Sequence, residues 1–231
     1  MPKSDIQAIY IRHAVPNNRI PVSDMLDGYF DTNKMAVLEI GMQKGNLDPD
    51  QGYLTAKEKT ELIDNINSFN TSCRELGVPI IHIGAKFRVG GIDFNQAHFM
   101  RTLALSGQKA FPNPKMEEGS PLCEFAVEVK KNDYLDYSLK RYNTFEGTDI
   151  EFLLKVLKKE IIVLTGFGSD CFALGTGFAG ICKDYKAILA EDLFKPYEEK
   201  LGEGTKRIFS LFIGLVLDSK DLVAELKLQN E

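Results

Sequence analysis

An alternation of short apolar runs with amphipathic segments constrains this chain more than any other feature of its sequence. The runs are rich in β-branched residues, as the buried strands of a parallel sheet are, and they cover residues 35–40, 78–83, 161–164, 185–190 and 213–217. Segments with helical spacing cover about 55–77, 148–158, 169–182 and 196–210, and a last one follows residue 219. Strands that alternate with helices form one sheet with helices on both faces. The sequence therefore predicts an α/β fold with an open, mostly parallel sheet between two helical layers.

Local signals place the ends of several helices. Thr55 and Glu58 have the spacing of a capping box, in which each side chain bonds the backbone of the other residue. Thr148 and Glu151 have the same spacing ahead of a second helix. Ser219 is expected to cap the last helix.

The charge and the cysteine content exclude several classes of protein. The chain has 231 residues, and 28 Lys and Arg against 33 Asp and Glu give a net charge of −5, which argues against nucleic-acid binding. No stretch approaches the roughly 18 consecutive apolar residues of a membrane span, and the first residues lack the apolar core of a secretion signal. Four cysteines without CxxC spacing indicate reduced thiols in the cytoplasm. We expect an N-terminal arm over residues 1–33 and one α/β domain over residues 34–231.

The residues that follow the strands are the candidates for a functional site, because ligands of open α/β sheets lie outside the carboxyl ends of the strands. The positions to inspect follow the expected strand ends, which are Ile40, Ile83, Leu139, Leu164 and Ala190. Residues 84–121 are punctuated by Gly and Pro and form a segment longer than a simple connector needs to be. This segment is therefore expected to have a function of its own.

Five segments near these strand ends carry a family resemblance. They are AVLEIGMQ, GVPIIHIGAKFR, LKRYNTFEGTDIEFLL, IIVLTGFGSDCFALGT and YKAILAEDL. Over roughly residues 29–226 the sequence resembles the isochorismatase-like cysteine hydrolase family. The resemblance implies a three-layer, Rossmann-like fold, a small-molecule pocket at the carboxyl ends of the strands, and a homo-oligomer.

The family's chemistry, as the resemblance implies it, needs three groups. A carboxylate at the end of the first strand acts as a base, and a lysine after the third strand stabilises charge. A cysteine at the start of the helix after the fourth strand is the nucleophile, because a helix N-terminus beside an ammonium lowers the pKa of a thiol. Backbone N–H groups at that point can hold the oxyanion. The usual substrates are small amides, and the isochorismatase branch acts on a vinyl ether, for which general acid chemistry suffices.

This chain keeps only part of that set. Aligned with the family motifs, Gly41 stands at the position of the aspartate and Phe172 at that of the cysteine, with Cys171 one position earlier. Lys140 matches the family's lysine, and Gln43 matches the glutamine of the first motif. Two of three catalytic positions are substituted, so the resemblance implies an impaired cysteine-hydrolase site.

Two neighbours are candidates to replace the missing groups. Glu39 lies on the same strand face as Gly41, and a carboxylate inside an apolar strand is costly unless it is paired, for instance with Lys140. It can also pair with another cation or reach solvent. Cys171 is rotated by roughly 100° from the catalytic position, and it is either the nucleophile or an inert thiol. The candidate catalytic residues are therefore Lys140, Cys171 and Glu39, although Lys140 can also be an ordinary surface lysine.

A second group of residues is expected to contact the substrate. Arg88 can bind a carboxylate with two N–H groups, or it can form a weak surface ion pair. The ring of Phe172 would fill the base of the pocket or stack on a ligand. The expected substrate-binding residues are Gly41, Gln43, Arg88, Tyr142, Phe167, Gly168 and Phe172.

Neither a metal nor another cofactor is expected. A metal-binding branch of the family has an Asp-x-His cluster after its second strand, where this chain reads Gly-Ala-Lys-Phe over residues 84–87. The three histidines of the chain show no ligand spacing. His82, inside a predicted strand, is expected to be a hydrogen-bonded core residue.

Glycine motifs leave a nucleotide-binding alternative open. Residues 175–180 satisfy GxGxxG, but they fall inside a predicted helix rather than directly after a strand, so they indicate close helix packing. Gly166 and Gly168 are better placed, at a strand-to-helix turn, and Glu191 or Asp192 ends the next strand.

Three functions follow from these residues. The first is an isochorismatase-like protein with a small-molecule pocket at the strand ends and an impaired cysteine-hydrolase site. The second is an active hydrolase of a small amide or vinyl ether that uses Cys171, Glu39 and Lys140. The third is a structural or partner-binding subunit that uses the arm and the segment over residues 84–121.

Overall fold

The central sheet positions every other part of the molecule. The computed structural model of the chain describes residues 28–48, 53–94 and 116–229. Within them, six parallel strands lie in the order β3-β2-β1-β4-β5-β6. The strands are β1 (Met35–Ile40), β2 (Ile80–Ile83), β3 (Tyr134–Asp136), β4 (Ile161–Phe167), β5 (Lys186–Lys195) and β6 (Gly214–Leu217). The strand order reverses between β1 and β4, and an open α/β sheet has its ligand crevice at such a point.

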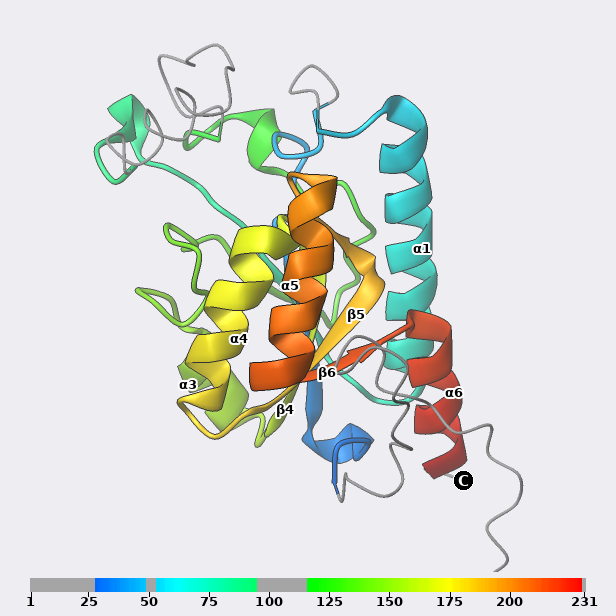
Figure 1. The fold of residues 1–231 in the computed structure, drawn as a ribbon. Helices are drawn as coiled ribbons and strands as arrows, with labels where there is room; N and C mark the ends of the chain where they lie inside the picture. Colours follow the sequence, from blue (N-terminus) through cyan, green and yellow to red (C-terminus); the bar gives the residue numbers. More distant parts are fainter. Residues whose placement is uncertain (1–27, 49–52, 95–115, 230–231) are drawn as a thin grey trace, which may run out of the picture.

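Helices cover both faces of the sheet, which confirms the predicted three-layer α/β fold (Figure 1). One face carries α1 (Ala56–Glu75) and α6 (Ser219–Gln229), and the other carries α3 (Ile150–Val156), α4 (Leu174–Ile181) and α5 (Glu199–Phe212). Successive side chains of a strand point to opposite faces, so each face has its own core. In β1, Met35 and Val37 pack on the α1 side, whereas Leu38 and Ile40 pack on the α3 side.

Short turns of helix connect these elements. They are the 3-10 turns η2 (Thr32–Lys34), η4 (Val89–Gly91) and η5 (Pro121–Cys123) and the π-helical turn η6 (Ser169–Ala173), which leads into α4. The strand ends at Ile40 and Ile83 are confirmed. The expected strand end at Leu139 is wrong, because β3 is a short edge strand that ends at Asp136.

The first predicted capping box is confirmed, and the second, Thr148 with Glu151, is wrong. At the start of α1 the Thr55 hydroxyl accepts from the Glu58 N–H at 3.2 Å, and the Glu58 carboxylate accepts from the Thr55 N–H at 2.8 Å. In contrast, α3 follows Asp149, whose side chain makes no capping hydrogen bond. The Glu151 carboxylate binds two lysine ammonium groups instead, each at 2.6 Å.

The last helix is capped by Asp218 rather than by Ser219. The Asp218 side chain accepts from the N–H of Lys220 at 2.9 Å, and its carbonyl oxygen accepts from the N–H of Leu222 at 3.0 Å. Ser219 is the first residue of α6, and its hydroxyl donates to Asp192 Oδ2 at 2.6 Å. The carboxylate within β5 therefore binds the hydroxyl group that was expected to cap the helix.

The end of the expected N-terminal arm belongs to the core. Phe30 is 2% exposed and packs in the cluster between the sheet and α1. Residues 1–27 of the arm lie outside the described residues. In the part of the chain that the structure describes, no helix has the length and apolar character needed to cross a membrane.

The glycines of the GxGxxG motif bring α4 close to its neighbours, as the sequence indicated. A Cβ atom on Gly175 would lie 2.4 Å from the backbone oxygen of Tyr142, and one on Gly177 would lie 2.8 Å from a side-chain carbon of Ile213. The motif lies inside α4 and not at a strand end.

Candidate active site

The position of the family's carboxylate, at the end of β1, is built for a glycine. Gly41 has a φ angle of +73°, which residues with a side chain rarely adopt. A Cβ atom there would lie 3.3 Å from the Phe167 carbonyl oxygen and 3.3 Å from Asn46 Nδ2. Asn46 Nδ2 also donates to the Gly41 carbonyl oxygen at 2.9 Å. The backbone turn itself therefore disfavours a catalytic carboxylate at this position.

The thiol of Cys171 is held by the turn that begins η6. This thiol donates to the Gly168 carbonyl oxygen at 3.4 Å, and Gly168 has a left-handed conformation with φ of +85°. Burial raises the pKa of Cys171 well above its ordinary value, and the negative charge of Asp170 adds to the shift. Because the thiolate is the nucleophilic form, this raised pKa leaves Cys171 a neutral thiol at neutral pH.

An aromatic cluster surrounds the position at which the family has its cysteine. The ring of Phe172 meets the ring of Tyr142 edge-on, with centroids 5.4 Å apart. A Cβ atom on Gly168 would lie 2.8 Å from the Phe172 ring and 2.6 Å from the Tyr197 ring. Phe167 is fully buried and meets Tyr197 with centroids 4.8 Å apart. The structure thus brings together four of the expected substrate-binding residues, which are Tyr142, Phe167, Gly168 and Phe172.

Lys140 lies against the segment that follows β2. Its ammonium donates to the Lys86 carbonyl oxygen, lies 3.5 Å from Asp93 Oδ2, and lies 5.0 Å from the centroid of the Phe87 ring. Within the described residues, neither Glu39 nor Cys171 is among its partners.

Arg88 is exposed, and the contact that the structure gives it is through its backbone. Its N–H donates to Asp93 Oδ1 at 2.9 Å. Its predicted role in substrate binding stays a prediction.

Glu39 belongs to a buried polar cluster on the α1 face of the sheet. The side chains of Glu39 and His82 are both fully buried, and Glu39 Oε1 lies 2.7 Å from His82 Nδ1. Asn70 Nδ2 on α1 donates to Glu39 Oε2 at 2.7 Å. On the other side of the ring, His82 Nε2 lies 3.1 Å from Asp133 Oδ2, which also pairs with Arg74 at 2.7 Å. Glu39 thus pairs with a core histidine rather than with the candidate lysine.

The same cluster confirms His82 as a hydrogen-bonded core residue. Burial disfavours the charged ring, but the hydrogen bonds and charges of Glu39 and Asp133 outweigh burial and raise the pKa of His82. Both ring nitrogens face carboxylate oxygens, which suits an imidazolium that donates from both of them.

Gln43 joins two segments that are distant in sequence. Its Nε2 donates to the carbonyl oxygens of Ala85 at 2.8 Å and Cys123 at 2.7 Å, and its Oε1 accepts from the Ala85 N–H at 2.7 Å. The side chain is fully buried, and a Cβ atom on Gly84 would lie 2.6 Å from its amide carbon. The Gln43 amide therefore holds these two segments together, and its predicted contact with a substrate stays a prediction.

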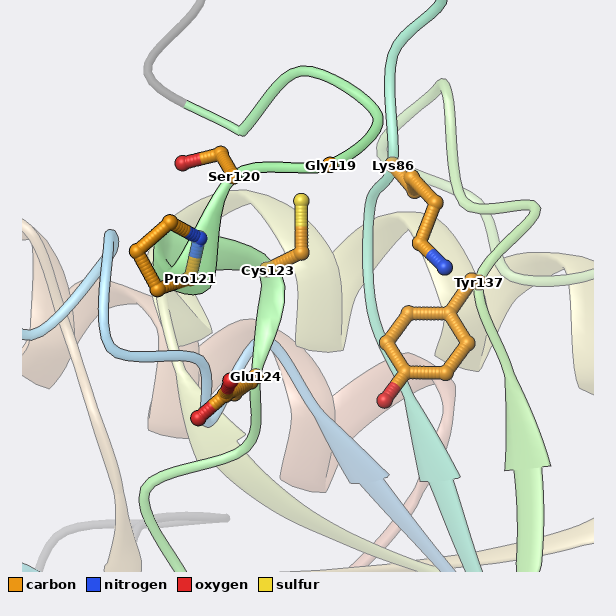
Figure 2. Close-up of a pocket in the computed structure, with 7 residues that line it drawn as sticks. All are labelled: Lys86, Gly119, Ser120, Pro121, Cys123, Glu124 and Tyr137. Atoms are coloured by element: carbon orange, nitrogen blue, oxygen red, sulfur yellow. The ribbon is translucent and has the colours of Figure 1, made fainter.

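A pocket lies at the carboxyl ends of β2 and β3 (Figure 2). Its volume is about 250 Å³. The lining residues come from the segment after β2, from η5 and its surroundings, and from the position directly after β3, and they are Lys86, Gly119, Ser120, Pro121, Cys123, Glu124 and Tyr137. None of the residues predicted for the site lines this pocket.

Sequence reasoning missed this pocket because its walls come from three separate segments without a common motif. The residue that could have indicated the pocket is Gln43, which follows β1. A buried amide must satisfy its donors and acceptor, so a glutamine at this position indicates that other backbone segments converge on it.

The carboxylates of the nucleotide-binding alternative are bonded to protein groups. Glu191 lies 3.4 Å from the Lys206 ammonium, and Asp192 accepts from the N–H and the hydroxyl of Ser219. A Cβ atom on Gly166 would lie 2.0 Å from the Ile40 carbonyl oxygen, so this glycine serves close strand packing.

Comparison with known proteins establishes the class of the chain. A model of the isochorismatase domain matches residues 35–207. The match covers most of the chain, and the chain therefore belongs to the isochorismatase family.

Solved structures share the fold. A cysteine hydrolase from Pseudomonas syringae pv. phaseolicola 1448A is 16% identical, with a TM-score of 0.75, over 89% of this chain and 98% of that one. Pyrazinamidase of Pyrococcus horikoshii in complex with zinc is 16% identical, with a TM-score of 0.65, over 80% of this chain and 99% of that one. N-carbamoylsarcosine amidase from Thermoplasma acidophilum is 17% identical, with a TM-score of 0.60, over 80% of this chain and 96% of that one. Among curated proteins, no sequence gives a significant match.

The residues of this chain do not fit the zinc that accompanies the Pyrococcus protein. The segment after β2, residues 84–87, contains no Asp, Glu, Cys or His. Across residues 28–48, 53–94 and 116–229, no three side chains of these types are placed to hold a metal ion. The ring nitrogens of His82 both face carboxylate partners within the core.

Proposed function

We propose that this member of the isochorismatase family binds a small molecule at the carboxyl ends of its strands without cysteine-dependent hydrolysis. The observation that carries the proposal is the hydrogen bond from the Cys171 thiol to the Gly168 carbonyl oxygen, with a phenylalanine ring at the next position. A protonated thiol that donates to a backbone oxygen lacks the thiolate needed to attack a carbonyl carbon.

The other two catalytic positions support the same proposal. Gly41 has no side chain to act as a base, and its positive φ disfavours one. The Lys140 ammonium is bound to the Lys86 carbonyl oxygen and to Asp93, so it does not lower the pKa of the Cys171 thiol.

The competing function is an active hydrolase of a small amide or vinyl ether. It would need Cys171, Glu39 and Lys140 to act on one substrate. Each of them has different partners: the Gly168 carbonyl for the thiol, His82 for the carboxylate and the Lys86 carbonyl for the ammonium. All three contacts would have to change, so we favour binding without hydrolysis.

Incubation of the full chain with a panel of small aliphatic and aromatic amides, and with isochorismate as the vinyl ether, tests the proposal. We expect no turnover above that of the buffer, and the same result for Cys171→Ser. Cys182→Ser is the matched control, because Cys182 is an exposed cysteine at the other end of α4. Turnover that is lost in Cys171→Ser and kept in Cys182→Ser would overturn the proposal.

The proposal includes a homo-oligomer, as the family resemblance implies, and a place in the cytoplasm, as the reading of the four cysteines as reduced thiols indicates. Phe152 on α3 and Phe212 on α5 are 71% and 65% exposed, and we propose that these two side chains lie in the contact between copies. Sedimentation equilibrium of the full chain and of a chain without residues 1–27 checks this. Association that depends on those residues would favour the structural or partner-binding role instead.

A further inference from the structure

The pocket at the ends of β2 and β3 contains a lysine, Lys86, whose ammonium has no counter-charge among the residues that the structure describes. The Lys86 ammonium lies 4.3 Å from the centroid of the Tyr137 ring. In the described part of the chain it has no ion-pair partner and no hydrogen-bond acceptor, and the Tyr137 hydroxyl makes no hydrogen bond there. By contrast, the carboxylate of Glu124 pairs with Lys44 at 2.5 Å. The pocket therefore presents two donors, the Lys86 ammonium and the Tyr137 hydroxyl, on one side. The negative charge of its Glu124 carboxylate is paired with the Lys44 ammonium.

The wall opposite these donors includes an apolar part, formed by Pro121 and Cys123. Figure 2 shows the Cys123 sulfur pointing into the space between residues 119–121 and Lys86, with the Pro121 ring beside it. The Cys123 thiol is 4% exposed and donates to the Glu117 carbonyl oxygen at 3.2 Å. Burial raises the pKa of Cys123 although two nearby lysines oppose the shift, so this thiol stays uncharged at neutral pH. A ligand would thus meet donors on one side and the Pro121 ring and the Cys123 thiol on the other.

Hydrogen bonds fix the walls to one another. The buried Gln43 amide ties Ala85, next to Lys86, to the carbonyl oxygen of Cys123 at 2.7 Å. The Phe87 N–H donates to the Met116 carbonyl oxygen at 2.8 Å, and an isolated antiparallel bridge joins Ala85 to the segment after β3. A site whose walls are preorganised loses little entropy on binding.

We propose that this pocket binds a small organic carboxylate, with the Lys86 ammonium and the Tyr137 hydroxyl donating to the carboxylate and the carbon skeleton lying against Pro121 and Cys123. Its volume, about 250 Å³, is below the roughly 300 Å³ at which pockets for drug-sized ligands begin, so the ligand is compact. The site is distinct from the cysteine-hydrolase position, because Gly41, Lys140 and Phe172 do not line it. The inference rests on the proposed function only in that a ligand binds at the strand ends.

Calorimetric titration of the full chain with sodium benzoate, benzamide and benzylammonium chloride tests the charge requirement. These probes share a ring and differ in charge. We expect saturable binding of benzoate, with benzamide and benzylammonium weaker by on the order of tenfold or more, since a charge-assisted hydrogen bond is lost. Equal affinity for benzoate and benzamide, or no saturable binding of benzoate, would overturn the inference.

Variants of the two donors locate the bound carboxylate. We expect Lys86→Met to weaken benzoate binding on the order of tenfold and Tyr137→Phe to weaken it less, whereas Lys86→Arg keeps most of the affinity. Lys227→Met is the matched control, because it removes the same charge from the exposed last turn of α6. Thermal unfolding of each variant shows whether it is folded.

The variants also separate this inference from the proposed function. An unchanged benzoate affinity in folded Lys86→Met, or an equal loss in Lys227→Met, would contradict the inference whatever the hydrolysis assay shows. Turnover that depends on Cys171 would contradict the absence of hydrolysis and would leave the benzoate result standing.

Discussion

At the scale of single residues, the buried cluster of Glu39, His82 and Asp133 makes stability depend on pH. The folded state raises the pKa of His82 above its ordinary value of 6.5, because the two carboxylates outweigh burial. A raised folded pKa stabilises the protein fully below the unfolded pKa, and this contribution is lost as the pH rises through the folded pKa. We therefore expect the free energy of unfolding to fall between about pH 6.5 and the raised pKa of His82.

Urea unfolding between pH 6 and pH 9 checks this expectation in the wild type and in His82→Asn. The variant should be less stable by about 3–5 kcal/mol at pH 6, because it leaves the buried Glu39 carboxylate without its cation. The difference between the two proteins should shrink as the pH rises. If the free energies of unfolding of the two proteins changed with pH in parallel, His82 would not be charged in the folded state.

The four cysteines should differ widely in their reaction with iodoacetamide. Cys182 is exposed, whereas burial raises the pKa of Cys73 to about 12 and that of Cys171 still further above its ordinary value. We expect labelling at pH 7 to reach Cys182 first and to leave Cys171 unmodified until the chain unfolds, because only the thiolate reacts. Peptide mapping measures this, with the chain in guanidinium as the control. Labelling of Cys171 before Cys182 would point to an activated nucleophile.

At the scale of elements, two helix glycines should respond to alanine in opposite directions. Gly175 in α4 has no room for a side chain, since a Cβ atom would lie 2.4 Å from the Tyr142 carbonyl oxygen. Gly204 in α5 is exposed, and a Cβ atom there would meet nothing within 4 Å. We expect Gly175→Ala to lower the free energy of unfolding by about 1–3 kcal/mol and Gly204→Ala to raise it by about 0.5–1 kcal/mol. Urea unfolding of both variants checks the pair, and stabilisation by both would contradict the close packing of α4.

The elements also show how far the sequence predicts the fold. All residues of β1 and β4 are buried, and strands covered on both faces appear as continuous apolar runs that a single sequence reveals. β3 has three residues, and Leu135 at its centre is 50% exposed. An edge strand of this kind has no apolar run, so the strand end expected at Leu139 was wrong.

The site was harder to predict than the fold, because it depends on contacts between distant segments. Alignment with the family placed Gly41 and Phe172 at two catalytic positions, and the local turns at both are consistent with those residues. It could not reveal that Glu39 pairs with His82 across the sheet, at 2.7 Å, since helical or strand spacing does not specify a cross-strand partner. The pocket beside Lys86 was missed for the same reason.

At the scale of the whole molecule, one sheet supports two separate cores. The core on the α1 side includes Ile66, and the core on the α3 side includes Leu154, and both side chains are fully buried. The strands of the sheet contribute alternate residues to each core. Loss of packing on either face therefore weakens strands that the other face needs, and the domain should unfold as one cooperative unit.

Ile66→Ala and Leu154→Ala test this coupling as a matched pair on opposite faces. Each should lower the free energy of unfolding by about 2–5 kcal/mol because each leaves a cavity, and the double variant should show the sum within about 0.5 kcal/mol, since the two sites share no partner. The chain has eight tyrosines and no tryptophan, so tyrosine fluorescence and far-UV circular dichroism provide two probes. The two signals should follow a single transition in every variant. A second transition in either single variant would mean that the two layers unfold independently, and the sheet would then not be the unit of stability.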